Sequence, residues 1–212
     1  YDMGDGFSLS AGRMLSYLGF EAYDPINMYQ YSYAYSYAGV QDVYDAYRDG
    51  MSANYVADIF SIGIWGGYDS GKLGYEYVLA YTGVENLTVK AIFAEAAADV
   101  SDTYTIWGSY QFDKFMVAAE VVEKDVLAAN TATTGDIEGY LVMTDITLTD
   151  ALGLTLRYSE EEIGTATTYD KFTIAPNYAF TENLSGLVEF SDVDSSDATK
   201  KNLFAVEMIY SF

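Results

Sequence analysis

The sequence predicts an all-β fold, a transmembrane antiparallel up-and-down β-barrel of about 12 strands that forms a single domain over residues 1–212. Three observations lead to this prediction. Apolar residues recur at every second position through much of the chain, which is the period of a strand with one apolar face. Although 50% of the residues are hydrophobic, no run approaches the roughly 20 apolar residues of a membrane-spanning helix, so a membrane would be entered as a closed barrel. The expected connections are short at one end of the strands and long at the other.

The last eleven residues, Asn202 to Phe212, show the alternation most clearly. One face carries only apolar side chains, and the last of them is the C-terminal residue: Phe204, Val206, Met208, Tyr210 and Phe212. This pattern resembles the closing strand of bacterial outer-membrane barrels, a resemblance that implies a signal read by the barrel-assembly machinery. A core strand of a soluble sandwich is the alternative that the pattern leaves open.

The strands before this one are expected from alternation and from the turn residues between them. In chain order they are Phe7–Met14, Val40–Tyr47, Asn54–Gly67, Leu73–Tyr81, Leu87–Ala96, Thr103–Phe112, Phe115–Glu123, Ile137–Leu148, Leu152–Glu160, Phe172–Phe180 and Leu184–Val193. In Leu152–Glu160, for example, leucines at 152, 154 and 156 oppose Gly153, Thr155 and Arg157. One apolar and one small or polar face suits a lipid-facing exterior and a wet lumen. A soluble sandwich would show the same alternation with core and solvent exchanged.

The lengths of the connections separate these two folds. On the side of Phe212 the connections are short, at 82–86, 113–114, 149–151 and 181–183. On the other side 124–136, 160–171 and 193–201 are longer, and only 68–72 is short. Outer-membrane barrels have this asymmetry, whereas a sandwich gives no reason for loop length to follow strand parity.

Composition narrows the class of protein further. The chain has 22 Tyr, 11 Phe and 2 Trp, and amphipathic rings of this kind form the interfacial girdles of membrane barrels. There are 32 acidic and 10 basic residues, a net charge of −22. This charge disfavours nucleic acid and anionic membrane surfaces as partners, whereas an acidic lumen would attract cations. Acidic surface charge is also a solubility or high-salt adaptation, so selectivity does not follow from net charge alone.

Residues 15–38 break the regular pattern. They contain Gly19, Pro25 and an alternating run of tyrosines at 29, 31, 33, 35 and 37. If this stretch were a barrel strand, the parity of the connections would fail, so we expect one excursion from the extracellular end. An outer loop of this size resembles the inward-folded constriction loop of general porins.

The stretch 12–40, GRMLSYLGFEAYDPINMYQYSYAYSYAGV, also resembles the central signature of the OmpL-like β-barrel porin family. The matching positions are Gly12, Arg13, Gly19, Phe20, Glu21, Asp24, Pro25, Asn27, Ser32, Gly39 and Val40, and the segment 64–69 around Trp65 resembles the Gly-Trp-Asp step of the same family. That family carries further strands before this point. The chain therefore either closes at about 12 strands or is the later part of a barrel of about 16. Because it starts at Tyr1 without Met or a signal peptide, we expect a processed form or a portion of something longer.

The residues give no support for an enzyme, a metal centre or a cofactor. Without His or Cys, the common catalytic triads and zinc sites cannot be built. Glu160, Glu161 and Glu162 fall in an expected loop, where a solvated charge run is the plainer reading. A weak calcium candidate is Asp192, Asp194 and Asp197, which lacks the Gly and the distal Glu of an EF-hand.

Transport is the chemistry that remains. Strand parity places seven charged residues on the lumen face, namely Glu76, Lys90, Glu120, Asp145, Arg157, Glu189 and Glu207. Arg13, Glu21 and Asp24 are expected at or near the constriction. In a narrow pore such charges set the sign of the permeant ion, whereas the plainer reading of each is a wall residue in a mutual salt bridge.

Two functions follow from this reading. The first is a diffusion porin in the outer membrane of a Gram-negative bacterium, passing ions and small hydrophilic solutes with a preference for cations. The second is a structural or recognition barrel whose lumen is occluded, with the tyrosine-rich segment as the obstruction; a secreted tyrosine-rich β-protein is a weaker third reading. Expected partners are outer-membrane lipid and lipopolysaccharide, the assembly machinery, small solutes and cations, and two further copies in a homo-trimer; nucleic acid is not among them.

Overall fold

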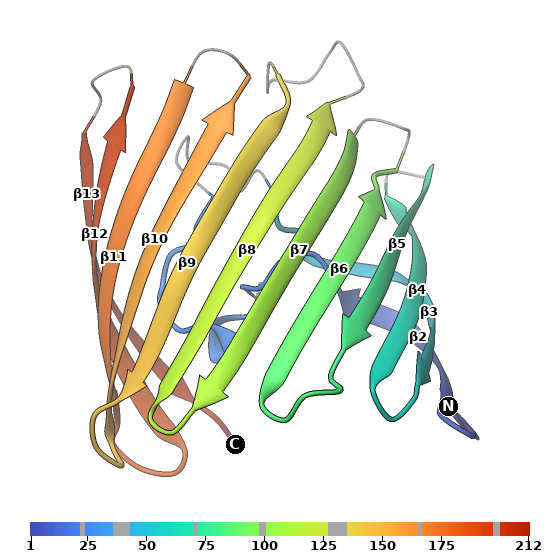
Figure 1. The fold of residues 1–212 in the computed structure, drawn as a ribbon, viewed down its shortest axis with the longest axis horizontal. Coiled ribbons are helices and arrows are strands. Elements are labelled where there is room, and N and C mark those ends of the chain that lie inside the picture. Colours follow the sequence, from blue (N-terminus) through green and yellow to red (C-terminus); the bar gives the residue numbers. More distant parts are fainter. Residues whose placement is uncertain are drawn as a thin grey trace.

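The computed structural model describes residues 1–21, 24–35, 43–69, 72–97, 101–126, 135–164, 167–196 and 200–212. These residues form one antiparallel sheet in which every strand pairs with its neighbours in the chain. The strands are β1 (Asp2–Gly4), β2 (Phe7–Leu15), β3 (Tyr47–Val56), β4 (Phe60–Asp69), β5 (Lys72–Tyr81), β6 (Leu87–Glu95), β7 (Ser101–Phe112), β8 (Phe115–Val126), β9 (Ile137–Thr147), β10 (Leu152–Ile163), β11 (Thr167–Ala179), β12 (Leu184–Ser195) and β13 (Lys201–Tyr210). Figure 1 shows that the sheet is strongly tilted and curved, with the segment between β2 and β3 on its concave side.

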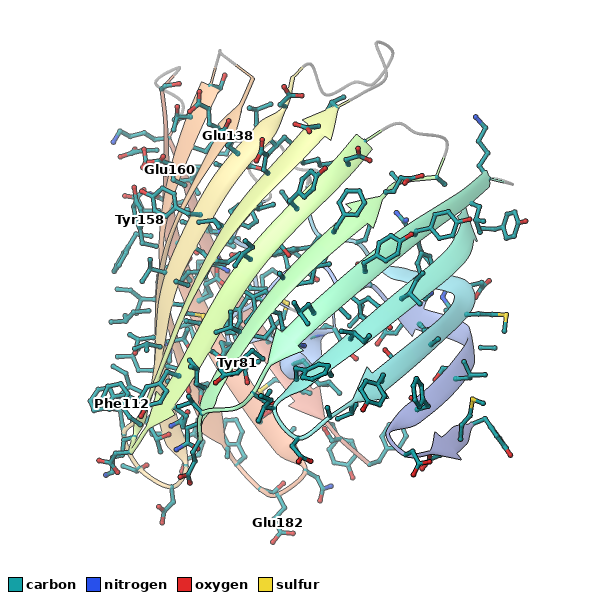
Figure 2. All side chains as sticks on the ribbon, turned by 45° about the vertical axis from the view of Figure 1, so that its right-hand side comes forward. Tyr81, Phe112, Glu138, Tyr158, Glu160 and Glu182 are labelled. Carbon is teal, nitrogen blue, oxygen red and sulfur yellow. The ribbon has the colours of Figure 1, made fainter. Side chains whose placement is uncertain are left out.

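The two faces of the sheet differ as the alternation predicts. On the convex face apolar side chains are open to the surroundings, and Val142 and Phe204 are 56% and 62% exposed. On the concave face the neighbouring positions, such as Leu141 and Thr173, are buried. Figure 2 shows the side chains of the convex face projecting away from the ribbon. The apolar rows are therefore not packed against a second sheet, as they would be in a sandwich.

Strand parity places the connections at two rims. The C-terminal rim, at the bottom of Figure 1, carries the end of β13 and the turns at 57–59, 82–86, 113–114, 148–151 and 180–183. The opposite rim, here called the far rim, carries the connections 16–46, 70–71, 96–100, 127–136, 164–166 and 196–200. The expected long connections 160–171 and 193–201 are shorter than predicted, because β10, β11 and β12 extend into them. Glu160 pairs with Asp170 and Glu162 with Thr168, so polar side chains that suggested a loop continue the strands.

Two predicted strands need correction. The stretch Asn54–Gly67 is divided between β3 and β4 by a tight turn, in which the Ala57 amide donates to the Phe60 carbonyl at 2.8 Å. The turn lacks Gly and Pro, so the alternation reads through it as one strand. The predicted strand Val40–Tyr47 is also wrong where it is described: residues 43–46 are irregular, only Tyr47 belongs to β3, and residues 40–42 lie outside the described residues.

The two outer strands of the sheet leave their edges unpaired. Within the described residues no pairing joins β13 to β1 or β2, so the sheet is curved but its closure is not observed. No helix of the described residues is long and apolar enough to cross a membrane.

The first prediction concerns the environment of the convex face. Replacing Val142 by Arg in the middle of β9 should destabilise the protein in lipid vesicles by about 2–4 kcal/mol, because the charge would enter hydrocarbon. The measurement is urea unfolding in liposomes. The matched control, Glu138→Arg on the same face near the far rim, should cost about 0–1 kcal/mol. Equal small costs at both positions would place the convex face in water.

Candidate pore constriction

The segment between β2 and β3, here called the inward segment (residues 16–46), leaves the far rim and returns to it. Its described parts are 16–21, 24–35 and 43–46, with one short 3-10 helix at Pro25–Asn27. The other described residues of the segment are irregular, and they lie against the concave face of the sheet (Figure 1). Irregular backbone leaves N–H and C=O groups without secondary-structure partners, so a segment lying on the concave face must find partners on the strands beneath it, here called the wall.

Three wall carboxylates bind backbone amides of the inward segment. Glu76 on β5 accepts from the amide of Tyr17 at 2.6 Å, and Glu120 on β8 accepts from that of Phe20 at 3.1 Å. Glu189 on β12 accepts from the amide of Ser32 at 2.8 Å. All three carboxylates are buried. Hydrogen bonds to an ionised acceptor are the stronger ones, so these contacts fix the segment at three points across the sheet.

Wall donors satisfy its carbonyl groups in turn. The Nζ of Lys171 on β11 donates to the Tyr33 carbonyl at 2.9 Å and to the Ser32 hydroxyl at 2.6 Å. The Ser159 hydroxyl on β10 donates to the Ala34 carbonyl at 3.2 Å. The wall therefore supplies both hydrogen-bonding functions that the irregular backbone lacks.

The centre of this network is an ion pair between Glu21 of the inward segment and Arg157 of β10. Glu21 Oε1 pairs with Arg157 Nη1, and Glu21 Oε2 accepts from the Ala34 amide at 2.7 Å. Gln30 Nε2 donates to Glu21 Oε1 at 2.5 Å, and Arg157 Nη1 donates to the Ser32 carbonyl at 2.8 Å. Glu21 and Arg157 are only 2% and 1% exposed, so each charge depends on the other and on these hydrogen bonds.

Apolar packing completes the attachment of the inward segment. Its residues Ala34, Tyr35, Val43 and Tyr44 share one buried cluster with Met116, Ala118, Val122, Ile137, Leu141 and Met143 of β8 and β9. A second cluster joins Leu18 to Ile92, Ala94 and Trp107 of β6 and β7, and the Phe20 ring meets Trp107 edge-on at 5.3 Å. The wall beneath the segment is consequently packed with apolar side chains.

All seven charged residues expected on the lumen face lie on the concave face, but they differ in burial and in the contacts that they make. Glu76, Glu120, Glu189 and Arg157 are buried beneath the inward segment. The other three are Lys90, Asp145 and Glu207, which are half-buried. Lys90 lies over the Trp107 ring at 4.9 Å, and Asp145 lies 2.7 Å from the Thr155 hydroxyl, which is positioned to donate to it. Glu207 lines a cavity of about 320 Å³ with Tyr31 and Ser32 of the segment.

The three residues expected at the constriction lie in different surroundings in the structure. Glu21 is buried in the ion pair described above, and half-buried Asp24 accepts a hydrogen bond from the Tyr47 hydroxyl at 2.9 Å. Arg13 requires a correction. The strand register sets it beside Asp49, on the convex face that also carries Met51, so it does not point toward the constriction.

Several polar residues of the network were not expected from the sequence. Lys171 and Glu161 lie just beyond the predicted ends of their strands, and both are buried on the concave face. Extending the alternation of Phe172–Phe180 and Leu152–Glu160 by one residue each would have found them. Nothing in the sequence marked Ser32 as the meeting point of Lys171 and Glu189.

The calcium candidate is not assembled. Asp192 and Asp194 lie on the convex face, and Asp194 forms an exposed ion pair with Lys200 at 2.6 Å. The hydrogen bond to Asp194 raises the pKa of Lys200. Asp197 lies outside the described residues, and no group of three or more acidic residues among the described ones is arranged to hold a metal ion.

The second prediction tests the buried ion pair. Replacing Glu21 by Ala should destabilise the fold by about 3–5 kcal/mol, because Arg157 would remain buried without its counter-charge. The combined change Glu21→Gln with Arg157→Met should cost clearly less than the sum of the single changes. Chemical unfolding in detergent measures all three variants. Asp45→Ala, which breaks the partly exposed Arg48–Asp45 pair, is the control and should cost at most about 1 kcal/mol. Additive costs at 21 and 157 would show that the two side chains are not coupled.

The known proteins that resemble this chain are all solved structures of similar fold. No family model matches the chain, and no curated protein matches it. The resemblance of residues 12–40 to the OmpL-like family therefore stays a prediction.

Solved structures match at low identity over nearly the whole chain. OmpT, an outer-membrane protein of Vibrio cholerae, is 14% identical with a TM-score of 0.72, covering 98% of this chain and 77% of that one. OpdK of Pseudomonas aeruginosa, solved with vanillate, is 12% identical with a TM-score of 0.63, covering 99% and 66%. A BenF-like porin from Pseudomonas fluorescens Pf-5 is 12% identical with a TM-score of 0.61, also covering 99% and 66%. Identities this low show similarity of fold alone. The sheet of this protein is similar to those of porin-type outer-membrane barrels.

Proposed function

We propose that this protein is a channel for small hydrophilic solutes in the outer membrane of a Gram-negative bacterium, and that the inward segment narrows it. The observation that carries the proposal is the combination of an exposed apolar convex face with an irregular segment bound to the polar concave face. A soluble protein has little reason to expose rows such as Val121, Val142 and Phe172. No enzymatic role is proposed, since the residues that the structure brings together serve to hold the segment.

The convex face supports a defined position in the bilayer. Tyr81 and Phe112 lie toward the C-terminal rim and Tyr158 toward the far rim, with Glu138 and Glu160 beyond it (Figure 2). Aromatic rings at two levels and carboxylates outside them are what an outer-membrane barrel presents at its interfaces. In this placement the far rim is extracellular and meets lipopolysaccharide. The apolar row from Phe204 to Phe212 would then be the signal for the assembly machinery, and a homo-trimer would form through the convex face.

A channel in a membrane also requires a closed sheet. Unpaired backbone along β13, along β1 and along the part of β2 that β1 leaves uncovered would be costly in hydrocarbon, so these edges must be joined directly or by additional strands. The matched OmpT and OpdK chains are longer than this one, which supports the version with about 16 strands.

Cation preference is proposed from the charges that remain accessible. Asp24, Asp145 and Glu207 are half-buried, and no hydrogen-bonded cation is seen beside them among the described residues. With a net charge of −22, the water-filled part of the lumen would have a negative potential that concentrates cations.

An occluded barrel is the second candidate, and one observation favours it. The inward segment covers the concave face of β8 and β9 with apolar contacts, so that part of the interior is filled by packed side chains. The two candidates differ in whether water remains between the segment and the strands that face it across the barrel.

The third prediction tests the channel and its selectivity. The full-length protein reconstituted in planar bilayers should give discrete channels that prefer K⁺ to Cl⁻, and Glu207→Lys should lower that preference about three- to tenfold. Reversing one charge alters the interaction with an ion about 6 Å away by about 1.4 kcal/mol in water, and salt weakens this effect. Glu138→Lys on the convex face is the matched control and should leave the preference unchanged. Folded protein without discrete channels would favour the occluded barrel.

A further inference from the structure

Acidic side chains are distributed unequally over the convex face. On β6 to β12 they form rows across neighbouring strands near the far rim. Two of these rows are Glu123, Glu138 and Glu162 on β8 to β10, and Glu160, Asp170 and Asp194 on β10 to β12. A third row, Glu95, Asp102 and Asp125, extends the acids to β6. The basic residues within these strands lie on the concave face, namely Lys90, Lys124, Arg157 and Lys171. We call the three rows the acidic band.

The convex face of β2 to β5 lacks such a band. At the far-rim ends of these strands it presents Tyr47, Tyr68 and Leu73, which are exposed. Among the described side chains of the four strands, the charged ones on this face are Arg13 and Asp49, which stand directly opposite each other in the strand register. Their charges are opposite in sign. This part of the convex face, here called the neutral face, therefore carries no net charge.

The neutral face is also hollowed. A groove of about 620 Å³ begins on it and crosses the apolar middle of the convex face as far as β7. It runs between two rows of side chains, of which one passes through Ile64 and Tyr77 and the other through Ile62 and Leu79. The short side chain of Ala53 on β3 is exposed in its lining. The groove therefore offers an apolar surface into which side chains of a partner can pack.

The acidic band restricts how two copies of this chain can meet in a membrane. Copies in one membrane have the same orientation, so side chains at equal depth face each other across a contact between them. A contact formed by β6 to β12 of both copies would oppose two acidic bands, and like charges juxtaposed at an interface are unfavourable. A contact of the band with a neutral face would bury carboxylates among apolar side chains, which is also unfavourable. Two neutral faces meet without either cost.

We propose that the neutral face is the surface on which a second copy of this chain docks through its own neutral face. Apolar side chains gain little by leaving hydrocarbon, so chains associate in a membrane through close packing, which the groove allows. Strands β2 to β5 have nine or ten residues each and cover a flat area of roughly 600 Å². A standard interface buries about 800 Å² of accessible surface on each partner, and side chains raise the accessible area above the flat value.

This inference rests on the membrane placement in the proposed function and locates the contact of the proposed homo-trimer. It is tested by cross-linking, for which the chain is suited because it contains no Cys. In proteoliposomes with lipid in large excess, a short bis-maleimide should join copies of Ile64→Cys and of Leu79→Cys. Val142→Cys and Phe190→Cys are similarly exposed on the convex face of β9 and β12. These two matched controls should remain single chains.

A change in the groove tests whether packing there holds the copies together. Ala53→Phe adds an apolar ring that hydrocarbon tolerates but a filled groove does not, so it should lower the cross-linking of Leu79→Cys at least about fivefold. Ala119→Phe is the matched control, because Ala119 is exposed on the convex face of β8 outside the groove. It should leave the cross-linking unchanged. Equal cross-linking at 79 and 142, none at either 64 or 79, or no effect of Ala53→Phe would overturn the inference; in the second case lipid alone would cover the groove.

Single-channel recording separates this inference from the function on which it rests. Discrete channels from protein that shows no cross-linking at 64 or 79 would overturn the inference and leave the channel in place. Folded protein that cross-links at these positions but gives no channels would overturn the proposed channel and leave the contact between copies.

Discussion

The structure depends on hydrogen bonds from the backbone amides of the inward segment to carboxylates of the wall. Glu76, Glu120 and Glu189 belong to β5, β8 and β12, and they hold Tyr17, Phe20 and Ser32. Because the three strands are far apart in the sheet, these bonds define the path of an otherwise irregular chain. The shape of the interior therefore follows from strand register. A slip of one residue would turn each carboxylate to the convex face and release the segment.

The use of these acids for attachment changes how the charge of the protein should be read. The carboxylates beneath the segment are buried and hydrogen-bonded, so in the proposed channel they would attract a permeant ion little, and the Glu21 charge is matched by Arg157. Much of the remaining negative charge lies on the convex face near the far rim, where Glu123 pairs with Glu138 and Glu138 with Glu162. Like charges across a pair of strands repel and disfavour folding, so these acids contribute to the negative charge of the convex surface near the far rim. In the proposed channel, the potential of the lumen would then be set by a few residues such as Asp145 and Glu207.

The strands and their two faces could be predicted from the sequence because alternation is a local signal. Alternation over Leu152–Glu160 or Asn202–Phe212 is visible within one strand, and it located both faces correctly. It failed at residues 57–59, where the turn contains no Gly or Pro, and at Glu160–Glu162, where acids continue a strand. The contacts of the candidate site could not be predicted in this way, because they join residues that are far apart in the sequence. Glu21 and Arg157 are 136 residues apart, and a single sequence gives no means of pairing them. Arg13 was expected near the constriction because it lies just before residues 15–38, whereas the alternation of β2 sets it on the same face as Phe7 and Leu9.

The two edges of the sheet differ in how well each could accept another strand. Exposed edge strands in soluble proteins usually avoid pairing through bulges, inward charges or prolines. β13 pairs with β12 in regular register from Lys201 to Tyr210 and contains no proline, so its free edge is suited to accept another strand. β2 contains Gly12 with a φ of +139° and exposes Arg13 on the convex face, and it offers a less regular edge. A direct joint of β13 to β2 would therefore set a regular strand against an irregular one. In the proposed channel, additional strands between them would avoid this mismatch and would enlarge the lumen beside Glu207, where a solute needs a path past the inward segment.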